Sequence, residues 1–240
     1  MTRKNGYKML VIRSLIFNAL FVFWTVFLCT FLQPLTWIGN KQASFAGRAW
    51  AWGIIWMLRV ICGITHKVEG MENIPSGPCV VASKHQSAWD TMIFFSVIKH
   101  PVFVMKKELL KIPLFGSFMA QMGMIPVNRE GGASALKSML VEVRKRMANG
   151  MSLIVFPEGT RTEVGQIAKY HPGIASIYQD PEIDVLFVPV ALDSGKCWSK
   201  SSFIKKPGVI TIKFLKPIKK GMDRREFMTK LQADIEAACK

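Results

Sequence analysis

The sequence predicts an α/β protein in which helices flank a mixed sheet and an N-terminal helical hairpin is embedded in a membrane. The chain carries no charged residue from Ser14 to Asn40. After residue 66, short apolar runs bounded by turn residues alternate with patterns of helical period. A chain of 240 residues is long enough for one such domain with an appendage. We therefore expect residues 1–66 to form membrane-anchoring helices and residues 67–240 to form the α/β domain.

The N-terminal region contains two apolar segments. Ser14 to Leu32 is long enough to cross a bilayer as one helix, and it exceeds the apolar core of a usual signal peptide. Basic residues precede this segment, which favours an N-terminus on the cytoplasmic side. Ala49 to Leu58 is rich in tryptophan but short. It either completes a second crossing with the residues up to Thr65 or lies in the membrane interface.

The charge balance favours a membrane partner over nucleic acid. Lys and Arg number 32 against 16 Asp and Glu, which gives a net charge of +16, and no acidic residue precedes Glu69. Anionic lipids attract such a region. Hydrophobic residues make up 50% of the chain and no nucleic-acid motif is present, so we expect no nucleic-acid partner. The five cysteines include no close pair, which indicates reduced thiols without a metal site.

The first strand and helix of the α/β region frame a pair of reactive side chains. Cys79 to Ala82 is an apolar run typical of a buried strand, and Trp89 to Ile98 has the pattern of an apolar helix. His85 falls in the loop between them, and Asp90 falls in the first helical turn. Residues five apart on one helix lie about 140° from each other, so the two side chains cannot touch within one regular helix, whereas this strand, loop and helix arrangement lets them meet.

His85 and Asp90 are the candidate catalytic residues. A histidine has an ordinary pKa of about 6.5, so it can take a proton from a hydroxyl and return it to a leaving group. Asp90 is able to orient the ring by accepting a hydrogen bond from the nitrogen that faces away from the substrate. The alternative is structural. Ser87-x-x-Asp90 is a variant capping box with Ser87 as the N-cap, in which Asp90 only satisfies backbone donors.

Basic side chains follow several of the expected strands. Val102 to Met105 is a strand that leads into Lys106, and Gly123 to Arg129 is a strand that ends in an arginine. Met151 to Phe156 is a third apolar strand, and it enters the turn Pro-Glu-Gly-Thr. The ends of such strands bind ligands in open α/β sheets, so we expect these cations to converge on one edge. For each one alone, a solvated surface charge is the alternative.

The turn after the third strand is suited to an anion. Arg161 offers a planar fork of donors that fits phosphate, and Gly159 lets the backbone approach a ligand closely. Glu158 would repel a phosphate, so we expect it to accept from a substrate hydroxyl or to orient Arg161. An ordinary surface turn with a salt bridge is the alternative.

The rest of the chain completes the α/β pattern. Apolar residues from Ala135 to Met147 recur at helical spacing with basic residues between them, which predicts an amphipathic helix. Asp184 to Val190 and Val209 to Phe214 have the composition of strands, and Asp223 to Ala238 that of a terminal helix. The stretch from Lys196 to Arg225 is strongly basic and forms either a solvated face or a contact with an acidic partner.

Four ordered blocks together resemble the bacterial 1-acyl-sn-glycerol-3-phosphate acyltransferases, a lysophosphatidate acyltransferase family with an HxxxxD motif. The resemblance covers roughly residues 67 to 215, and the blocks are His85 to Asp90, Gly123 to Arg129, Phe156 to Arg161 and Val188 to Val190. It implies a glycerol-3-phosphate acyltransferase-like fold. The chain departs from the family pattern at Lys84, where many members have asparagine.

The resemblance also implies roles for individual residues. His85 would be the general base and Asp90 its orienting carboxylate, with the acceptor hydroxyl attacking an acyl thioester directly. Pro189 is associated with the acyl-donor side. The residues implied to bind the glycerol phosphate part are Lys106, Arg129, Glu158, Gly159, Thr160 and Arg161.

We therefore expect transfer of a fatty acyl group from acyl-CoA or acyl carrier protein to the sn-2 hydroxyl of 1-acyl-sn-glycerol-3-phosphate, without metal or cofactor. Cytoplasmic donors require the α/β domain on the cytoplasmic face of the bacterial inner membrane, hence two crossings or a hairpin in one leaflet. Lyso-ornithine lipid and glycerol 3-phosphate are alternative acceptors. A protein of a different class, a non-catalytic binder of anionic lipids, is a further alternative. The pair of His85 and Asp90 counts against it, because binding alone does not require a base and its carboxylate.

Overall fold

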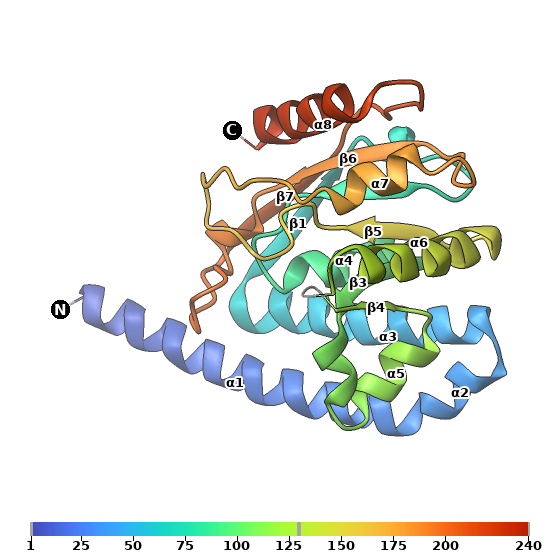
Figure 1. Ribbon diagram of the computed structural model, residues 1–240. Coiled ribbons are helices and arrows are strands. Elements are labelled where there is room, and N and C mark those ends of the chain that lie inside the picture. The colour runs from blue at the N-terminus through green and yellow to red at the C-terminus, as the bar shows by residue number, and fades with distance from the viewer. Residues whose placement is uncertain (1, 129–130, 240) are drawn as a thin grey trace.

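A mixed sheet forms the centre of the computed structural model, which describes residues 2–128 and 131–239 (Figure 1). Within these residues the sheet has seven strands in the order β1-β7-β6-β2-β5-β3-β4. The mixed sheet predicted from the sequence is thus confirmed. The strands are β1 (Ile64–Glu69), β2 (Val80–Ser83), β3 (Pro101–Lys106), β4 (Ile125–Val127), β5 (Ser152–Val155), β6 (Phe187–Leu192) and β7 (Gly208–Phe214).

Strand direction decides which loops meet. β2 is parallel to both β5 and β6, β5 is parallel to β3, and β3 is parallel to β4. β7 runs antiparallel to β6, and β1 is parallel to β7. The loops that follow β2, β3, β4 and β5 therefore leave the sheet at one edge, as the sequence predicts for the histidine loop and the basic strand ends.

Helices cover both faces of the sheet. Side chains of one strand alternate between the two faces, so Val81 joins the core under α3 and α4, whereas Val80 and Ala82 join the core under α6, α7 and α8. The helices are α1 (Thr2–Phe31), α2 (Gln33–Ile38), α3 (Asn40–Met57), α4 (Trp89–Val97), α5 (Phe115–Gln121), α6 (Gly132–Ala148), α7 (Gly173–Gln179) and α8 (Arg224–Ala238). A π-helical turn (Leu58–Cys62) extends α3, and short 3-10 turns occur at Met71–Asn73, Lys107–Lys111 and Ser194–Lys196.

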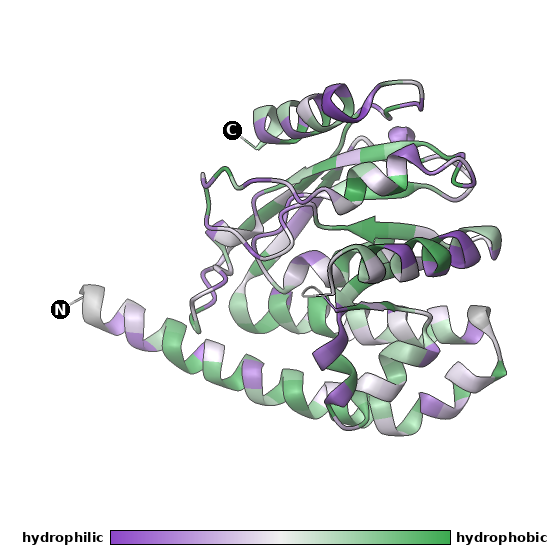
Figure 2. Cartoon of the chain, in the orientation of Figure 1, coloured by the Kyte–Doolittle hydropathy of each residue, from purple (hydrophilic) through white to green (hydrophobic). Residues whose placement is uncertain are grey.

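The two N-terminal apolar segments are helices that have the length and composition to cross a membrane. The candidate spans are Asn5–Phe31 and Gln42–Cys62. The second span has 21 residues, because the helix extends beyond the short segment expected from the sequence at both ends. Large apolar side chains on α1, such as Phe23 and Phe31, are more than 60% exposed, and Figure 2 shows apolar residues distributed along α1. An exposed apolar surface of this length supports membrane association.

The N-terminal helices share a core with the sheet. Trp50 of α3 packs edge-on against Phe95 of α4, with ring centroids 6.0 Å apart. Gly47 lets the two helices approach closely, because a Cβ there would lie 2.9 Å from the Phe95 ring. The boundary predicted between residues 66 and 67 falls inside β1. The division into two domains stays a prediction.

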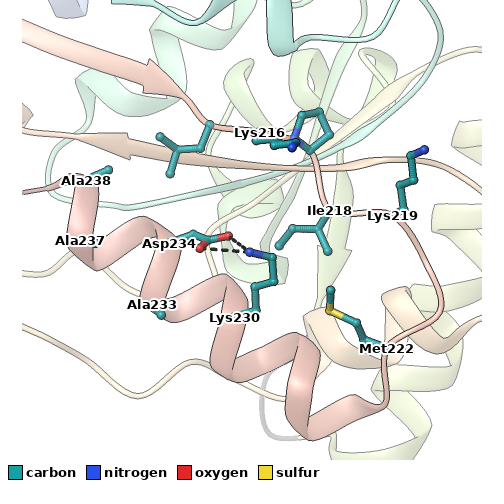
Figure 3. A pocket seen from close by; sticks show the side chains of 11 residues that line it. Lys216, Ile218, Lys219, Met222, Lys230, Ala233, Asp234, Ala237 and Ala238 are labelled. Atoms are coloured by element: carbon teal, nitrogen blue, oxygen red, sulfur yellow. Dashed lines mark hydrogen bonds and ion pairs between the residues drawn. The ribbon is translucent and has the colours of Figure 1, made fainter.

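A surface groove of about 800 Å³ lies away from the histidine loop (Figure 3). It runs between the segment after β7 and the outer face of α8, where Lys230 binds Asp234 at 2.9 Å. Ile218 in its lining pairs with Phe187 at the start of β6. Among the described residues, none from the loop after β2 lines the groove.

Candidate active site

The loop after β2 holds His85, and α4 holds Asp90 at its second residue. The amide of Lys84 still donates to the carbonyl of Val190 at 3.0 Å, so the loop leaves the sheet directly before the histidine. Asp90 is completely buried, and His85 Nδ1 lies 2.9 Å from Asp90 Oδ2. The structure thus brings together the two side chains that the sequence spacing allows to meet.

Asp90 also binds the backbone of the loop. Its Oδ2 atom accepts from the amide of Gln86 at 2.6 Å and from that of Ser87 at 2.8 Å. Both alternatives from the sequence therefore describe real contacts, because one carboxylate orients the ring and satisfies backbone donors. Ser87 makes the hydrogen bond expected of a capping residue, because its hydroxyl accepts from the amide of Trp89, although α4 begins one residue later than predicted and Ala88 directly precedes it.

The His85 ring has a defined tautomer and a defined plane. A carboxylate only accepts hydrogen bonds, so Nδ1 carries a hydrogen, and in the neutral form of the ring Nε2 has the free lone pair. Phe156, the residue after β5, stacks on the ring with centroids 3.9 Å apart and planes 16° apart. The His85 side chain is 15% exposed. A partly exposed neutral imidazole held in this way is suited to accept a proton from a bound hydroxyl.

Glu158 lies inside the protein beside the His85 backbone. Its Oε2 atom accepts from the His85 amide at 2.8 Å, and its Oε1 atom lies 2.7 Å from the ammonium of Lys84. Burial raises the pKa of Glu158, while Lys84, the His85 amide and the hydroxyl of Thr162 favour its carboxylate form. The Glu158 carboxylate thus points away from solvent, and its expected contact with a substrate hydroxyl stays a prediction.

Thr162 fixes the other side of the same peptide. Its amide and its hydroxyl both donate to the His85 carbonyl, at 2.8 and 3.0 Å. Together with Glu158, this residue holds the loop after β5 against the loop after β2. Sequence reasoning missed Thr162 and Lys84, since a threonine after a turn and a lysine before a loop carry no signal of burial.

Gly159 forms the turn that brings this loop back toward the site. Its amide donates to the carbonyl of Phe156 at 2.9 Å, and its φ of +66° lies in the left-handed region. A Cβ at this position would lie 2.6 Å from Cδ2 of His171. Glycine is therefore required here both by the backbone and by the packed imidazole.

Two of the predicted cations, Lys106 and Arg161, come at or after the ends of parallel strands and lie at the same edge of the sheet. Lys106 ends β3 and is exposed, and Arg161 and Thr160 are exposed in the loop after β5. Across residues 2–128 and 131–239, no carboxylate pairs with Lys106 or Arg161. Exposed cations without a carboxylate partner have donors available for an anionic group. Arg129 lies outside the described residues.

Pro189 has a different environment. It is buried within β6, where it pairs with Ala82 of β2. On the other side of β6, Val190 pairs with Phe214 and Phe187 with Ile218, so β7 and the segment after it contain one residue more than β6 between these pairs. A proline, which donates no backbone hydrogen bond, is accommodated at such an irregularity. Its expected role on the acyl-donor side stays a prediction.

No group of three or more His, Cys, Asp and Glu side chains able to hold a metal occurs in the described part of the chain. The cysteines of this part are all free.

The sequence is similar to those of known acyltransferases. A family model described as Acyltransferase matches residues 65–193, more than half of the chain. A 1-acyl-sn-glycerol-3-phosphate acyltransferase of Pseudomonas aeruginosa is 35% identical over 72% of this chain and 66% of its own length. One of Cocos nucifera is 27% identical over 78% of this chain and 59% of its own length. The chain thus matches less than two thirds of the length of these relatives.

A crystal structure shares the fold. The 1-acyl-sn-glycerophosphate (LPA) acyltransferase PlsC from Thermotoga maritima aligns with a TM-score of 0.76 over 95% of this chain and 96% of its own, at 20% identity. The matched family segment, residues 65–193, contains the His85 loop, α4 and the loop after β5. By its sequence match and its fold, the chain belongs to the acyltransferase family.

Proposed function

We propose that the protein transfers a fatty acyl group from a thioester of coenzyme A or acyl carrier protein to the sn-2 hydroxyl of 1-acyl-sn-glycerol-3-phosphate, which yields phosphatidate. The observation that carries this proposal is the 2.9 Å contact between His85 Nδ1 and Asp90 Oδ2, which leaves Nε2 as a base. The names of the relatives from Pseudomonas aeruginosa and Cocos nucifera support the choice of acceptor.

In the proposed reaction, His85 Nε2 removes the proton of the sn-2 hydroxyl as the hydroxyl oxygen attacks the thioester carbonyl carbon. The new C–O bond creates a tetrahedral oxyanion, and its collapse breaks the C–S bond. The imidazolium then returns the proton to the leaving thiolate, so atoms and charge balance without an acyl-enzyme. Asp90 stabilises the imidazolium that exists between the two proton transfers. The acyl donor is a co-substrate, and the proposal invokes no metal or other cofactor.

The acceptor phosphate is proposed to bind at the carboxyl edge of the sheet. Arg161 supports this assignment, because Thr162, the next residue, donates to the His85 carbonyl and thereby keeps the loop of Arg161 beside the base. Arg161 is able to bind two phosphate oxygens at once. Lys106 at the end of β3 and Arg129 after β4 are proposed to complete the site, with Gly159 and Thr160 shaping its wall and Glu158 supporting that wall from inside the protein.

The proposed location is the cytoplasmic face of the bacterial inner membrane. The exposed apolar surface of α1 supports insertion of the N-terminal helices, and a hairpin of α1 and α3 would return the chain to the side where it began. The excess of basic residues before Glu69 favours the cytoplasmic leaflet and its anionic lipids.

Acyl transfer by purified membranes tests the proposal. Labelled acyl-CoA and acyl carrier protein are offered with lysophosphatidate, lyso-ornithine lipid or glycerol 3-phosphate, and wild type is compared with His85→Ala. We expect transfer to lysophosphatidate, and a membrane-bound, folded His85→Ala variant without activity. Full activity of that variant would contradict the mechanism. Arg161→Ala should chiefly weaken the use of phosphate-bearing acceptors, and an equal loss with the phosphate-free lipid would count against the phosphate site.

A further inference from the structure

Lys84, directly before His85, is a buried cation. It is 1% exposed, and its ammonium donates to three oxygens, those of Glu158 Oε1 at 2.7 Å, Glu236 Oε1 at 2.8 Å and the Gln166 carbonyl at 2.9 Å. An ammonium has three hydrogens, so each finds an acceptor. Burial by itself lowers the pKa of Lys84, but the hydrogen bonds and charges of the two glutamates outweigh it and raise the pKa. Lys84 is therefore charged at neutral pH.

The contacts of Lys84 continue to the His85 backbone through Glu158. One Glu158 oxygen is held by Lys84, and the other accepts from the His85 amide at 2.8 Å. The Glu158 side chain has no exposed surface, so water does not replace Lys84 as its counter-charge. Without the ammonium, the buried carboxylate would either take up a proton or turn away, and in both cases its bond to the His85 amide would change.

Glu236 brings the C-terminal helix into this arrangement. It lies near the end of α8, 152 residues after Lys84, and it also accepts from the phenol of Tyr170 at 3.3 Å. Burial and the nearby charge of Glu236 raise the pKa of Tyr170, so the phenol keeps its hydrogen. Phe227, an α8 residue with no exposed surface, stacks on Tyr178 of α7 and packs edge-on against Phe187 of β6, which holds the helix against both α7 and the sheet.

We infer that Lys84 and Glu236 are positioning residues, and that the Glu236–Lys84–Glu158 bridge makes the C-terminal helix part of the apparatus that holds His85. This inference rests on the proposed role of His85 as the base. The bridge fixes the position and orientation of the His85 peptide, while Asp90 fixes the orientation of the imidazole ring. The Gln166 carbonyl adds the loop that carries Arg161 to the same bridge. The base and the proposed phosphate site therefore share one buried cation.

Kinetics of Lys84→Met and Glu236→Gln test the inference. A misplaced base lowers the chemical step more than substrate binding, so we expect Lys84→Met to reduce kcat by about tenfold to a hundredfold with KM changed by less than about threefold. Glu236→Gln keeps an acceptor oxygen but loses its charge, so about threefold to tenfold is expected. In the double variant Lys84→Met, Glu158→Gln the fully buried Glu158 position is neutral, and a neutral oxygen still faces the His85 amide, while Glu236, whose side chain is 14% exposed, keeps contact with water. Its kcat should exceed that of Lys84→Met.

Two variants control for burial and for helix position. Lys205→Met removes another buried lysine, which is 2% exposed and binds Asn18 rather than the His85 loop. Asp234→Asn removes a carboxylate two residues before Glu236 that pairs with Lys230 on the surface of α8. Both controls should keep kcat within about twofold of wild type, because neither touches the bridge. Wild-type kcat in Lys84→Met and Glu236→Gln, with His85→Ala inactive, would overturn the inference while the proposed function stands.

Amide hydrogen exchange over residues 83–90 gives a second readout that needs no activity. Lys84→Met and Glu236→Gln should speed exchange at the His85 amide by about tenfold or more, and Lys205→Met should not. If wild type fails to acylate any acceptor, the proposed function fails, and this exchange measurement alone decides on the bridge. Unchanged exchange in folded Lys84→Met protein would overturn it.

Discussion

Replacing Asp90 with asparagine separates the two tasks of this carboxylate. The donors that converge on Oδ2 are His85 Nδ1 and the amides of Gln86 and Ser87, at 2.9, 2.6 and 2.8 Å. An asparagine carbonyl should occupy that place, because its NH₂ group would face the same donors. The NH₂ group then faces the Ser87 hydroxyl, which lies 3.3 Å from Oδ1 and is able to accept. Asp90→Asn should therefore keep the loop and the ring tautomer and remove only the charge.

The lost charge determines the size of the effect. The imidazolium and carboxylate charges would be centred about 4 Å apart, and at an effective dielectric constant of about 20 they attract each other by roughly 4 kcal/mol. Since about 1.4 kcal/mol corresponds to a factor of ten in rate, kcat should fall by about 10²- to 10³-fold. If the amide instead turned its nitrogen toward His85, the wrong tautomer would result, and a loss near about 10⁴-fold is typical of that case.

The assay is acyl transfer from labelled acyl-CoA to lysophosphatidate, with circular dichroism and thermal denaturation as checks of folding. Asp180→Asn is the matched control, because Asp180 is also a buried carboxylate, pairs with Arg144 at 2.8 Å and accepts from the amide of Glu182. Its kcat should stay within about twofold of wild type. A folded Asp90→Asn variant with kcat within about threefold of wild type would refute the reasoning and leave Asp90 only its bonds to the backbone.

Two further predictions concern stability. Gly159→Ala should lower the free energy of unfolding by about 2 kcal/mol, because alanine is strained at φ +66° and its Cβ overlaps His171. Adding His171→Ala should restore only the part of the stability that the overlap removes, as measured by thermal denaturation. An unchanged melting temperature in the single variant would contradict this. Burial lowers the pKa of Lys205 from 10.5 to about 8, so between these values the unfolded chain binds more protons. The free energy of unfolding should therefore rise by roughly 3 kcal/mol as the pH is raised from 8 to 10.5, and this gain should disappear as the pH is lowered again. Denaturant titrations at both pH values should show the gain in wild type but not in Lys205→Met. Equal gains in both proteins would disprove the assignment.

Local patterns anticipated much of the fold. The strands β2, β3, β5, β6 and β7 and the helices α4, α6 and α8 lie close to the expected ranges, because their apolar periods reflect burial on one or two faces. β1, α5 and α7 were not anticipated. The exposed positions of β1 are the polar residues His66 and Lys67, and α5 and α7 are too short for a period to emerge.

The sequence by itself determined that His85 and Asp90 can meet where a loop enters a helix, because a spacing of five residues keeps them apart within one regular helix. It also determined the apolar N-terminal helices, whose length and lack of charge are local properties. Only the tertiary structure decided that β5 lies between β2 and β3, and that Glu158 faces inward to a buried Lys84 and a glutamate from α8. Such contacts join residues far apart in the chain, and the sequence of a charged residue does not show whether water or two carboxylates will surround it in the folded protein.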